Sequence, residues 1–209
     1  MKLKVIIIFL FATIPAFAQL DVSAGMGIDY VRNNVIDHIN SYAPSGAKLN
    51  DFNTGAVFFA EAGYKITPHF VTAIEYAHAI YSQDVAGGYK YSQITHKPSL
   101  MAYYIIEGIG YRFKFGGGAG PRFFAIDETL PGFIASNGYS ATGLGFELKA
   151  DGNTALSRNL YADISLLLNY DISGDISADD ASAQLHFRLT DTDANSFSAG
   201  IRLGLTYTF

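Results

Sequence analysis

Apolar and polar residues alternate regularly at both ends of the chain. From Phe197 to Phe209 every odd position is apolar, and every even position is small or polar. The segment from Leu20 to Tyr30 follows the same period of two. This period is typical of β-strands whose two faces meet different surroundings. Both ends of the chain are therefore predicted to be strands.

Six further segments between these ends carry strand patterns, although residues 99–106 are apolar on both faces and leave the orientation open. The eight predicted strands cover residues 20–30, 53–66, 70–81, 99–106, 111–124, 142–154, 160–171 and 197–209. Short connections (67–69, 107–110 and 156–159) alternate with long ones (32–52, 82–98, 125–141 and 172–196). This alternation and the even strand number are typical of membrane-spanning barrels. We predict an all-β fold, an eight-stranded antiparallel up-and-down transmembrane β-barrel.

Aromatic residues on the apolar face gather at the strand ends. Near the short connections lie Tyr64, Phe70, Tyr111, Phe113, Tyr207 and Phe209. Toward the long connections lie Tyr30, Phe58, Phe123, Tyr170 and Phe197. Two aromatic belts indicate two membrane interfaces. A soluble β-sandwich or lipocalin-like barrel is the alternative, but it would turn its apolar face inward. A ten-stranded barrel also remains open, because residues 183–189 keep the alternation of the last strand.

The first eighteen residues have the features of a secretory signal peptide. Lys2 and Lys4 precede an apolar run, and Ala16-Phe17-Ala18 resembles a cleavage site. Pro15 interrupts the run well before the roughly 20 apolar residues that a spanning helix needs. We therefore predict a cleaved signal peptide over 1–18, and a barrel with four long extracellular loops over 19–209.

Composition narrows the function classes. The chain has no cysteine, which excludes disulfides, cysteine-ligated zinc, a thiol nucleophile and the acylated cysteine of a lipoprotein. Its formal charge is −5, and it has no basic run, so nucleic acid is not an expected partner. Only 16 % of its residues are charged, against about 25 % in an average soluble domain.

The last six residues, Gly204-Leu205-Thr206-Tyr207-Thr208-Phe209, resemble the terminal assembly signal of Gram-negative outer-membrane barrels. With the strand count, the chain resembles the small OmpX/OmpA-type barrels. The resemblance implies integral insertion in the bacterial outer membrane, among its lipids and lipopolysaccharide. It also implies that the barrel-assembly machinery recognises Gly204, Tyr207 and Phe209 during biogenesis. Function varies among such barrels, so no activity follows from the fold.

The polar face is predicted to point into the lumen. It carries the acids Asp21, Asp29, Glu61, Glu75, Glu147, Asp151, Asp163 and Asp171 and the bases Lys65, Arg112, Lys114, Arg122, Lys149 and Arg202. An eight-stranded barrel is just wide enough for side chains to fill. Buried charges persist there when they are paired. We therefore predict a lumen plugged by ion pairs, for example Glu61 and Glu75 with Arg112 and Arg122.

Three functional hypotheses follow. The first is a non-enzymatic barrel with a structural role, or with a protein partner bound through its loops; no cofactor is expected. The second is a narrow channel for small solutes or ions. The third is a lipid A-modifying hydrolase, for which His78 and Ser82 share the lipid face, although about 13 Å of strand separates them.

Two other features of the sequence are candidate metal sites, and neither has the full set of ligands. Asp191-Thr192-Asp193-Ala194-Asn195 matches the first half of an EF-hand loop. It has Ser196 where the loop needs glycine and Arg202 where it needs glutamate, so a solvated acidic loop is favoured over calcium binding. The five histidines show no i, i+2 or i, i+4 spacing, so no metal site is predicted.

Overall fold

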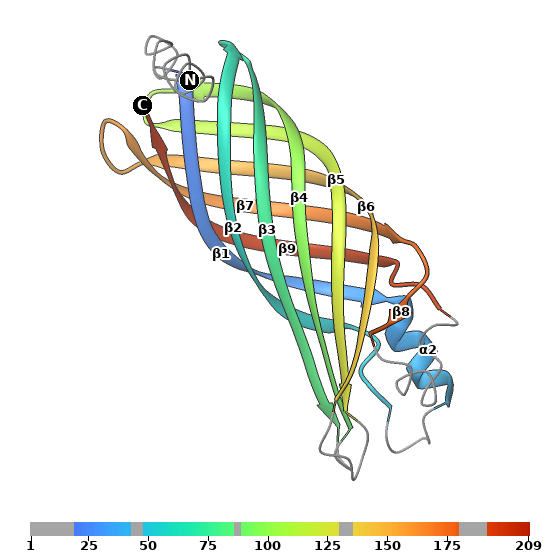
Figure 1. Cartoon of the computed structure of the whole chain (residues 1–209). Coiled ribbons are helices and arrows are strands. Elements are labelled where there is room, and N and C mark those ends of the chain that lie inside the picture. The colour runs from blue at the N-terminus through green and yellow to red at the C-terminus, as the bar shows by residue number, and fades with distance from the viewer. Residues whose placement is uncertain (1–18, 43–47, 86–88, 130–135, 180–191) are drawn as a thin grey trace, which may run out of the picture.

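A computed structural model describes residues 19–42, 48–85, 89–129, 136–179 and 192–209. Strands β1 to β7 and β9 form a closed antiparallel barrel, in which each strand pairs with its sequence neighbour, and β1 pairs with β9 (Figure 1). The barrel strands are β1 (Leu20–Asn33), β2 (Asn53–Thr67), β3 (Phe70–Val85), β4 (Tyr89–Gly108), β5 (Tyr111–Thr129), β6 (Asn137–Ala155), β7 (Leu160–Ser173) and β9 (Ser196–Thr208). The predicted eight-stranded barrel is confirmed.

The barrel is apolar outside and polar inside, the reverse of a soluble protein. On β3, Ile74 exposes 68 % of its surface, whereas the next residue, Glu75, exposes none. Both predicted aromatic belts are on the exposed face. A continuous band of exposed apolar side chains needs hydrocarbon around it. This is an integral barrel of the bacterial outer membrane. The orientation left open for residues 99–106 is settled, since Leu100, Ala102, Tyr104 and Ile106 face outward.

Two predicted loops are wrong, because they are mostly strand. Residues 82–85 and 89–98 extend the β3–β4 hairpin, and residues 125–129 and 137–141 extend the β5–β6 hairpin. Figure 1 shows these four strands running on beyond the rest of the barrel. We call residues 82–85, 89–95, 125–129 and 137–141 of these strands the extension. Its alternation is hard to recognise because the two faces exchange character: Tyr91 and Ile126 are buried, whereas Lys90 and Asp127 are exposed.

The first long loop contains a helix, α2 (Asn34–Tyr42), which directly follows β1. Among the described residues, no helix is long and apolar enough to span a membrane. The fourth long connection contains the two-residue strand β8 (Ser177–Ala178), which pairs with β6 outside the closed ring. The ten-stranded alternative is therefore wrong. Residues 1–18, with the predicted signal peptide, and residues 183–189 lie outside the described part.

The glycine-rich run in β5 reflects close packing, as its position within a strand predicts. A Cβ on Gly116 would lie 2.1 Å from the Ala102 carbonyl oxygen, and one on Gly118 would lie 2.3 Å from that of Leu100. Glycine lets the wall curve tightly here without a clash. The strand continues through the run to Thr129 instead of leading into a helix, so the run is not a phosphate-binding loop.

Candidate functional site: the lumen and its cap

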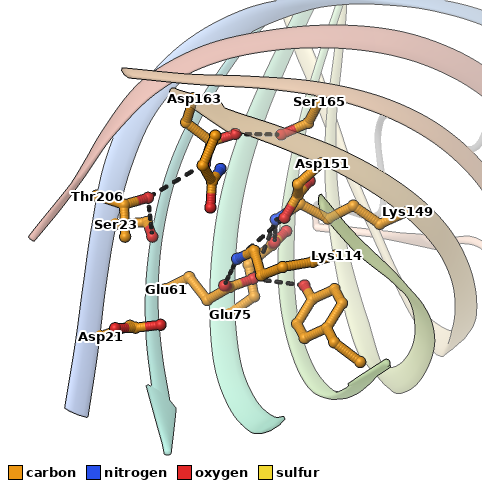
Figure 2. A network of polar contacts seen from close by, with 12 residues as sticks. Asp21, Ser23, Glu61, Glu75, Lys114, Lys149, Asp151, Asp163, Ser165 and Thr206 are labelled. Atoms are coloured by element: carbon orange, nitrogen blue, oxygen red, sulfur yellow. Dashed lines mark hydrogen bonds and ion pairs between the residues drawn. The ribbon is translucent and has the colours of Figure 1, made fainter. Parts of the chain in front are cut away.

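The middle of the lumen holds a continuous chain of ion pairs. Lys114 Nζ lies 2.9 Å from Glu61 Oε1, and Lys149 Nζ lies 3.0 Å from Glu61 Oε2. Lys149 also contacts Glu75 Oε2 at 2.7 Å, and Glu75 Oε1 accepts a 2.6 Å hydrogen bond from Arg202 Nη1. Figure 2 shows Glu61, Glu75, Lys114 and Lys149 converging from different walls. These side chains tie β2, β3, β5, β6 and β9 together across the lumen.

Further acidic groups surround this chain. Asp151 lies 3.0 Å from Lys114 Nζ, and Glu147 lies 3.9 Å from Arg202 Nη1. Asp163 accepts hydrogen bonds at 3.4 Å from the hydroxyls of Ser165 and Thr206 (Figure 2). Asp163 is therefore held by hydroxyl groups, whereas the other two carboxylates face bases.

At the end with the short turns, which is the periplasmic end in outer-membrane barrels, Arg112 Nη1 donates to Asp21 Oδ2 at 2.7 Å, and Arg112 Nε donates to Asn153 at 3.1 Å. The guanidinium also lies 5.3 Å from the centre of the Tyr161 ring. A polar pocket of about 250 Å³ opens beside this group. Lys65, predicted to point into the lumen, lies at its rim and pairs with Glu107 at 2.8 Å. The lumen thus begins as a small vestibule that ends at Arg112.

At the extracellular end of the membrane part, a second cluster crosses the lumen. Asp171 lies 2.7 Å from Arg122 Nε and 3.0 Å from Lys97 Nζ. All three side chains are almost completely buried. The sequence pattern does not identify Lys97 as a lumen residue, because it falls in the predicted loop 82–98.

Arg122 also closes a gap in the sheet. Pro98 on β4 lies opposite Pro121 on β5, and neither residue has an N–H to donate. Arg122 Nη1 approaches the carbonyl oxygens of Pro98, Gly120 and Pro121 at 3.1–3.3 Å. It also donates to Ser99 Oγ at 3.1 Å. One guanidinium thus joins the ion-pair cluster to the point where the β4–β5 ladder is interrupted.

The example pairing predicted from the sequence is wrong. Glu61 and Glu75 pair with Lys114, Lys149 and Arg202, whereas Arg112 and Arg122 pair with Asp21 and Asp171. Period-two alternation assigns each side chain to a face but gives no height in the barrel. Height follows from the stagger between strands, and it separates the two arginines toward opposite ends of the lumen.

A second closure follows the charged lumen: α2 lies at the end of the barrel after β1 (Figure 1), and its apolar side chains pack against buried residues of β4, β5 and β6. Asn33 caps the helix, since its Oδ1 accepts a 2.9 Å hydrogen bond from the Ile36 N–H. Val35, Ile36 and Ile39 expose at most 1 % of their surface. A signal for this helix exists in the sequence, because an asparagine cap precedes apolar residues at helical spacing.

The helix packs into an apolar cluster that we call the cap. The buried members are Val35, Ile36, Ile39, Leu49, Tyr89, Tyr91, Phe124, Ile126, Tyr139, Ala141, Ile176 and Ala194. At its margin, Glu128 accepts hydrogen bonds from the Tyr89 and Tyr139 hydroxyls at 2.8 and 3.3 Å. Burial raises the pKa of Tyr89, and the Glu128 carboxylate raises it further, so the phenol stays a donor. The cap is a small hydrophobic core outside the membrane.

The residues of the partial EF-hand motif and His78 of the hydrolase hypothesis contact other side chains or backbone groups of the protein. Asn195 Oδ1 accepts a 2.7 Å hydrogen bond from Ser173 N, and Asp193 Oδ1 accepts one of the same length from Asn34 Nδ2. Asp191 lies outside the described residues. On the outer face, His78 contacts His96 with a 3.4 Å Nδ1–Nδ1 distance. The geometry thus gives His78 an imidazole neighbour rather than the Ser82 hydroxyl of the hydrolase hypothesis.

The terminal residues of the predicted assembly signal lie on β9 and just after it. Tyr207 and Phe209 face outward, with ring centroids 4.9 Å apart. Gly204 faces inward, where an added Cβ would lie 2.7 Å from the Ala24 carbonyl oxygen. Recognition by the assembly machinery stays a prediction.

Comparison with known proteins gives the fold. No protein-family model matches the chain, and no curated protein matches it significantly. Among solved structures, Neisserial surface protein A superimposes with a TM-score of 0.55 at 15 % identity, over 91 % of this chain and 97 % of that one. A major outer membrane protein of Thermus thermophilus gives 0.52 at 16 %, over 91 % and 99 %. Ail of Yersinia pestis, in complex with the heparin analogue sucrose octasulfate, gives 0.50 at 15 %, also over 91 % and 99 %. The chain has the eight-stranded fold of the small outer-membrane β-barrels.

Proposed function

We propose that this protein is a non-enzymatic outer-membrane barrel with a closed lumen. Its exposed part, by which we mean the extension, α2 and the connections around them, has a structural or surface-interaction role. The observation that supports the proposal is that the lumen is closed at two levels. Ion pairs fill the membrane part, and the apolar cap covers the mouth. Conduction needs a hydrated path or a ring of one charge sign. Charges of mixed sign beneath an apolar lid favour a scaffold over a channel.

The charge of the exposed part bears on its partner. Its described acids outside the cap are Asp37, Asp51, Asp84, Asp127, Asp175, Asp179 and Asp193, and its described bases are Arg32, Lys48 and Lys90. This excess of acids favours a neutral or basic protein surface as the partner. It argues against transferring the sulfated ligand of Ail to this chain, because a polyanion would be repelled.

Single-channel recording in planar bilayers tests the closed lumen. The refolded mature chain is expected to give no discrete conductance steps, with empty detergent as the background control. A Val35→Ser, Ile39→Ser variant provides the matched comparison, because it loosens the cap and leaves the charged lumen intact. Discrete steps from the unmodified chain that change with Glu75→Gln or Arg112→Ala would overturn the proposal in favour of a narrow channel.

Two further measurements test the other parts of the proposal. Lipid A from cells that overexpress the protein is expected to keep its mass spectrum, whereas altered acylation would contradict a non-enzymatic role. Immobilised heparin is expected not to retain the protein at physiological salt. Retention there would contradict the preference for a neutral or basic partner.

A further inference from the structure

Three polar side chains converge on the outer face of the barrel. Tyr76 and His78 lie on β3, and His96 lies on β4 directly opposite His78. The two imidazole centroids are 4.9 Å apart, and the two Nδ1 atoms are 3.4 Å apart. Tyr76 Oη lies 2.6 Å from the same nitrogen of His96. His96 Nδ1 therefore has two polar neighbours, His78 Nδ1 and the Tyr76 phenol oxygen.

The group lies at the upper membrane interface. His78 is opposite Phe58 on β2, and His96 is opposite Phe123 on β5, and both phenylalanines belong to the upper aromatic belt. Both histidines are partly exposed. Aromatic belts sit at the level of the lipid headgroups, where water is present. Ions from the medium can therefore reach the two imidazoles.

We propose that His78 and His96 form a binding site for a divalent transition-metal ion, Zn²⁺ or Cu²⁺, with the Tyr76 phenol beside it. Zinc–imidazole bonds are about 2.0–2.1 Å long and tetrahedral, which places two ligating nitrogens roughly 3.3–3.4 Å apart. The observed Nδ1–Nδ1 distance of 3.4 Å matches that separation. Neutral imidazole is a preferred ligand of both ions.

The same contact argues against the alternative of an anion site. An anion would be held by two protonated rings, each with an N–H and a positive charge on the facing atoms. Two such nitrogens at 3.4 Å would repel each other. With the proton of each ring on Nε2, both Nδ1 atoms instead carry a lone pair that can bind a cation, and the Tyr76 hydroxyl donates to that of His96 until an ion displaces it. The contact geometry thus favours a cation between the rings.

The expected site is open. Among the described residues, no group of three or more histidine, cysteine or acidic side chains is placed to hold a metal. Two imidazoles therefore supply the protein ligands, and water completes the coordination. The bound ion would join β3 to β4 where the strands leave the membrane. Ligand binding of this kind stabilises the folded state that contains the site.

Calorimetric titration of ZnCl₂ into the refolded mature chain in detergent tests the site. We expect one saturable binding event, with affinity falling at least about tenfold in His78→Gln and in His96→Gln. His69→Gln is the matched control, since His69 lies at the periplasmic end, stacked on Tyr104, and should bind as the unmodified chain does. The chain has no cysteine, so no thiol competes.

CuCl₂ provides a second readout through quenching of tyrosine fluorescence, because the chain has no tryptophan. Quenching at low copper concentration should be lost in the double variant His78→Gln, His96→Gln, and should weaken in Tyr76→Phe. Heat-shifted gel mobility verifies that each variant is folded. Absence of saturable binding, or equal binding by the folded double variant, would overturn the proposal.

Discussion

The membrane part of the barrel and the extension are built from the same strands with opposite polarity. Strand β4 passes through both. In the membrane part, Lys97 is buried, whereas Leu100 exposes 67 % of its surface. Seven residues earlier, in the extension, Lys90 is exposed and Tyr91 is buried. The side chains keep their alternation throughout, and only their chemical character is exchanged.

The exchange follows from what surrounds each part. Lipid does not solvate polar side chains, so the charged groups lie in the lumen. There they must form ion pairs and hydrogen bonds with one another. Above the headgroups, water surrounds the outer face, and the interior closes through the hydrophobic effect. The barrel therefore has two cores, an ionic one in the membrane and an apolar one in the cap. A substitution in one core should destabilise that core more than the other.

Removal of Arg122 should have the largest effect, because it breaks the ionic core. Arg122→Ala leaves the buried Asp171 carboxylate without its 2.7 Å partner, and it uncovers the Pro98 carbonyl at the gap in the ladder. We expect the unfolding free energy to fall by about 3–5 kcal/mol, measured by urea unfolding in detergent. Arg32→Ala removes an exposed pair with Asp37 and should change it by about 0–1 kcal/mol. Equal effects would contradict an ionic core.

The cap should respond to the loss of apolar volume. Ile36→Ala removes buried methyl groups from the cap and should weaken the extension by about 2–5 kcal/mol. Amide exchange should then accelerate in α2 and the extension, while the membrane part stays protected. Ile74→Ala, on the lipid face, is the matched control and should leave the cap unchanged. Uniformly faster exchange would show that the two cores unfold together.

A smaller change tests how tightly the membrane part is filled. Gly116→Ala places a methyl group 2.1 Å from the Ala102 carbonyl oxygen, so the wall must shift, at a cost of about 1–3 kcal/mol. At Gly63, the first contact is a Val71 methyl group at 3.2 Å, so Gly63→Ala should be milder. Thermal unfolding of the two variants gives the comparison, and the reverse order would contradict the close approach at Gly116.

The rim of the vestibule should matter least. Lys65→Ala breaks the pair with Glu107, in which both side chains contact solvent. We expect a change of about 0–1 kcal/mol, reduced further by added salt. Urea unfolding at low and high salt measures it. A loss comparable to that of Arg122→Ala would mean that the ionic core reaches the periplasmic rim.

Much of the membrane part was predictable, since lipid outside and polar groups inside impose a strict period of two. Strand number, inward acids and the two aromatic belts follow from that period. The extension was not recognised, because both its faces mix polar and aromatic residues, as in Tyr89-Lys90-Tyr91-Ser92. The pattern therefore predicts a loop over residues 82–98 and gives no inward position for Lys97.

The sequence by itself determined the barrel, its inside-out polarity and the set of charges in its lumen, because these depend only on which face each residue occupies. The tertiary structure decided what depends on height and register: the pairing of Glu61 with lysines, the separation of Arg112 from Arg122, and the contact of His78 with His96. It also decided that α2 folds onto the mouth. Residues tens of positions apart become neighbours only through the stagger of the strands, and a one-dimensional pattern does not contain that stagger.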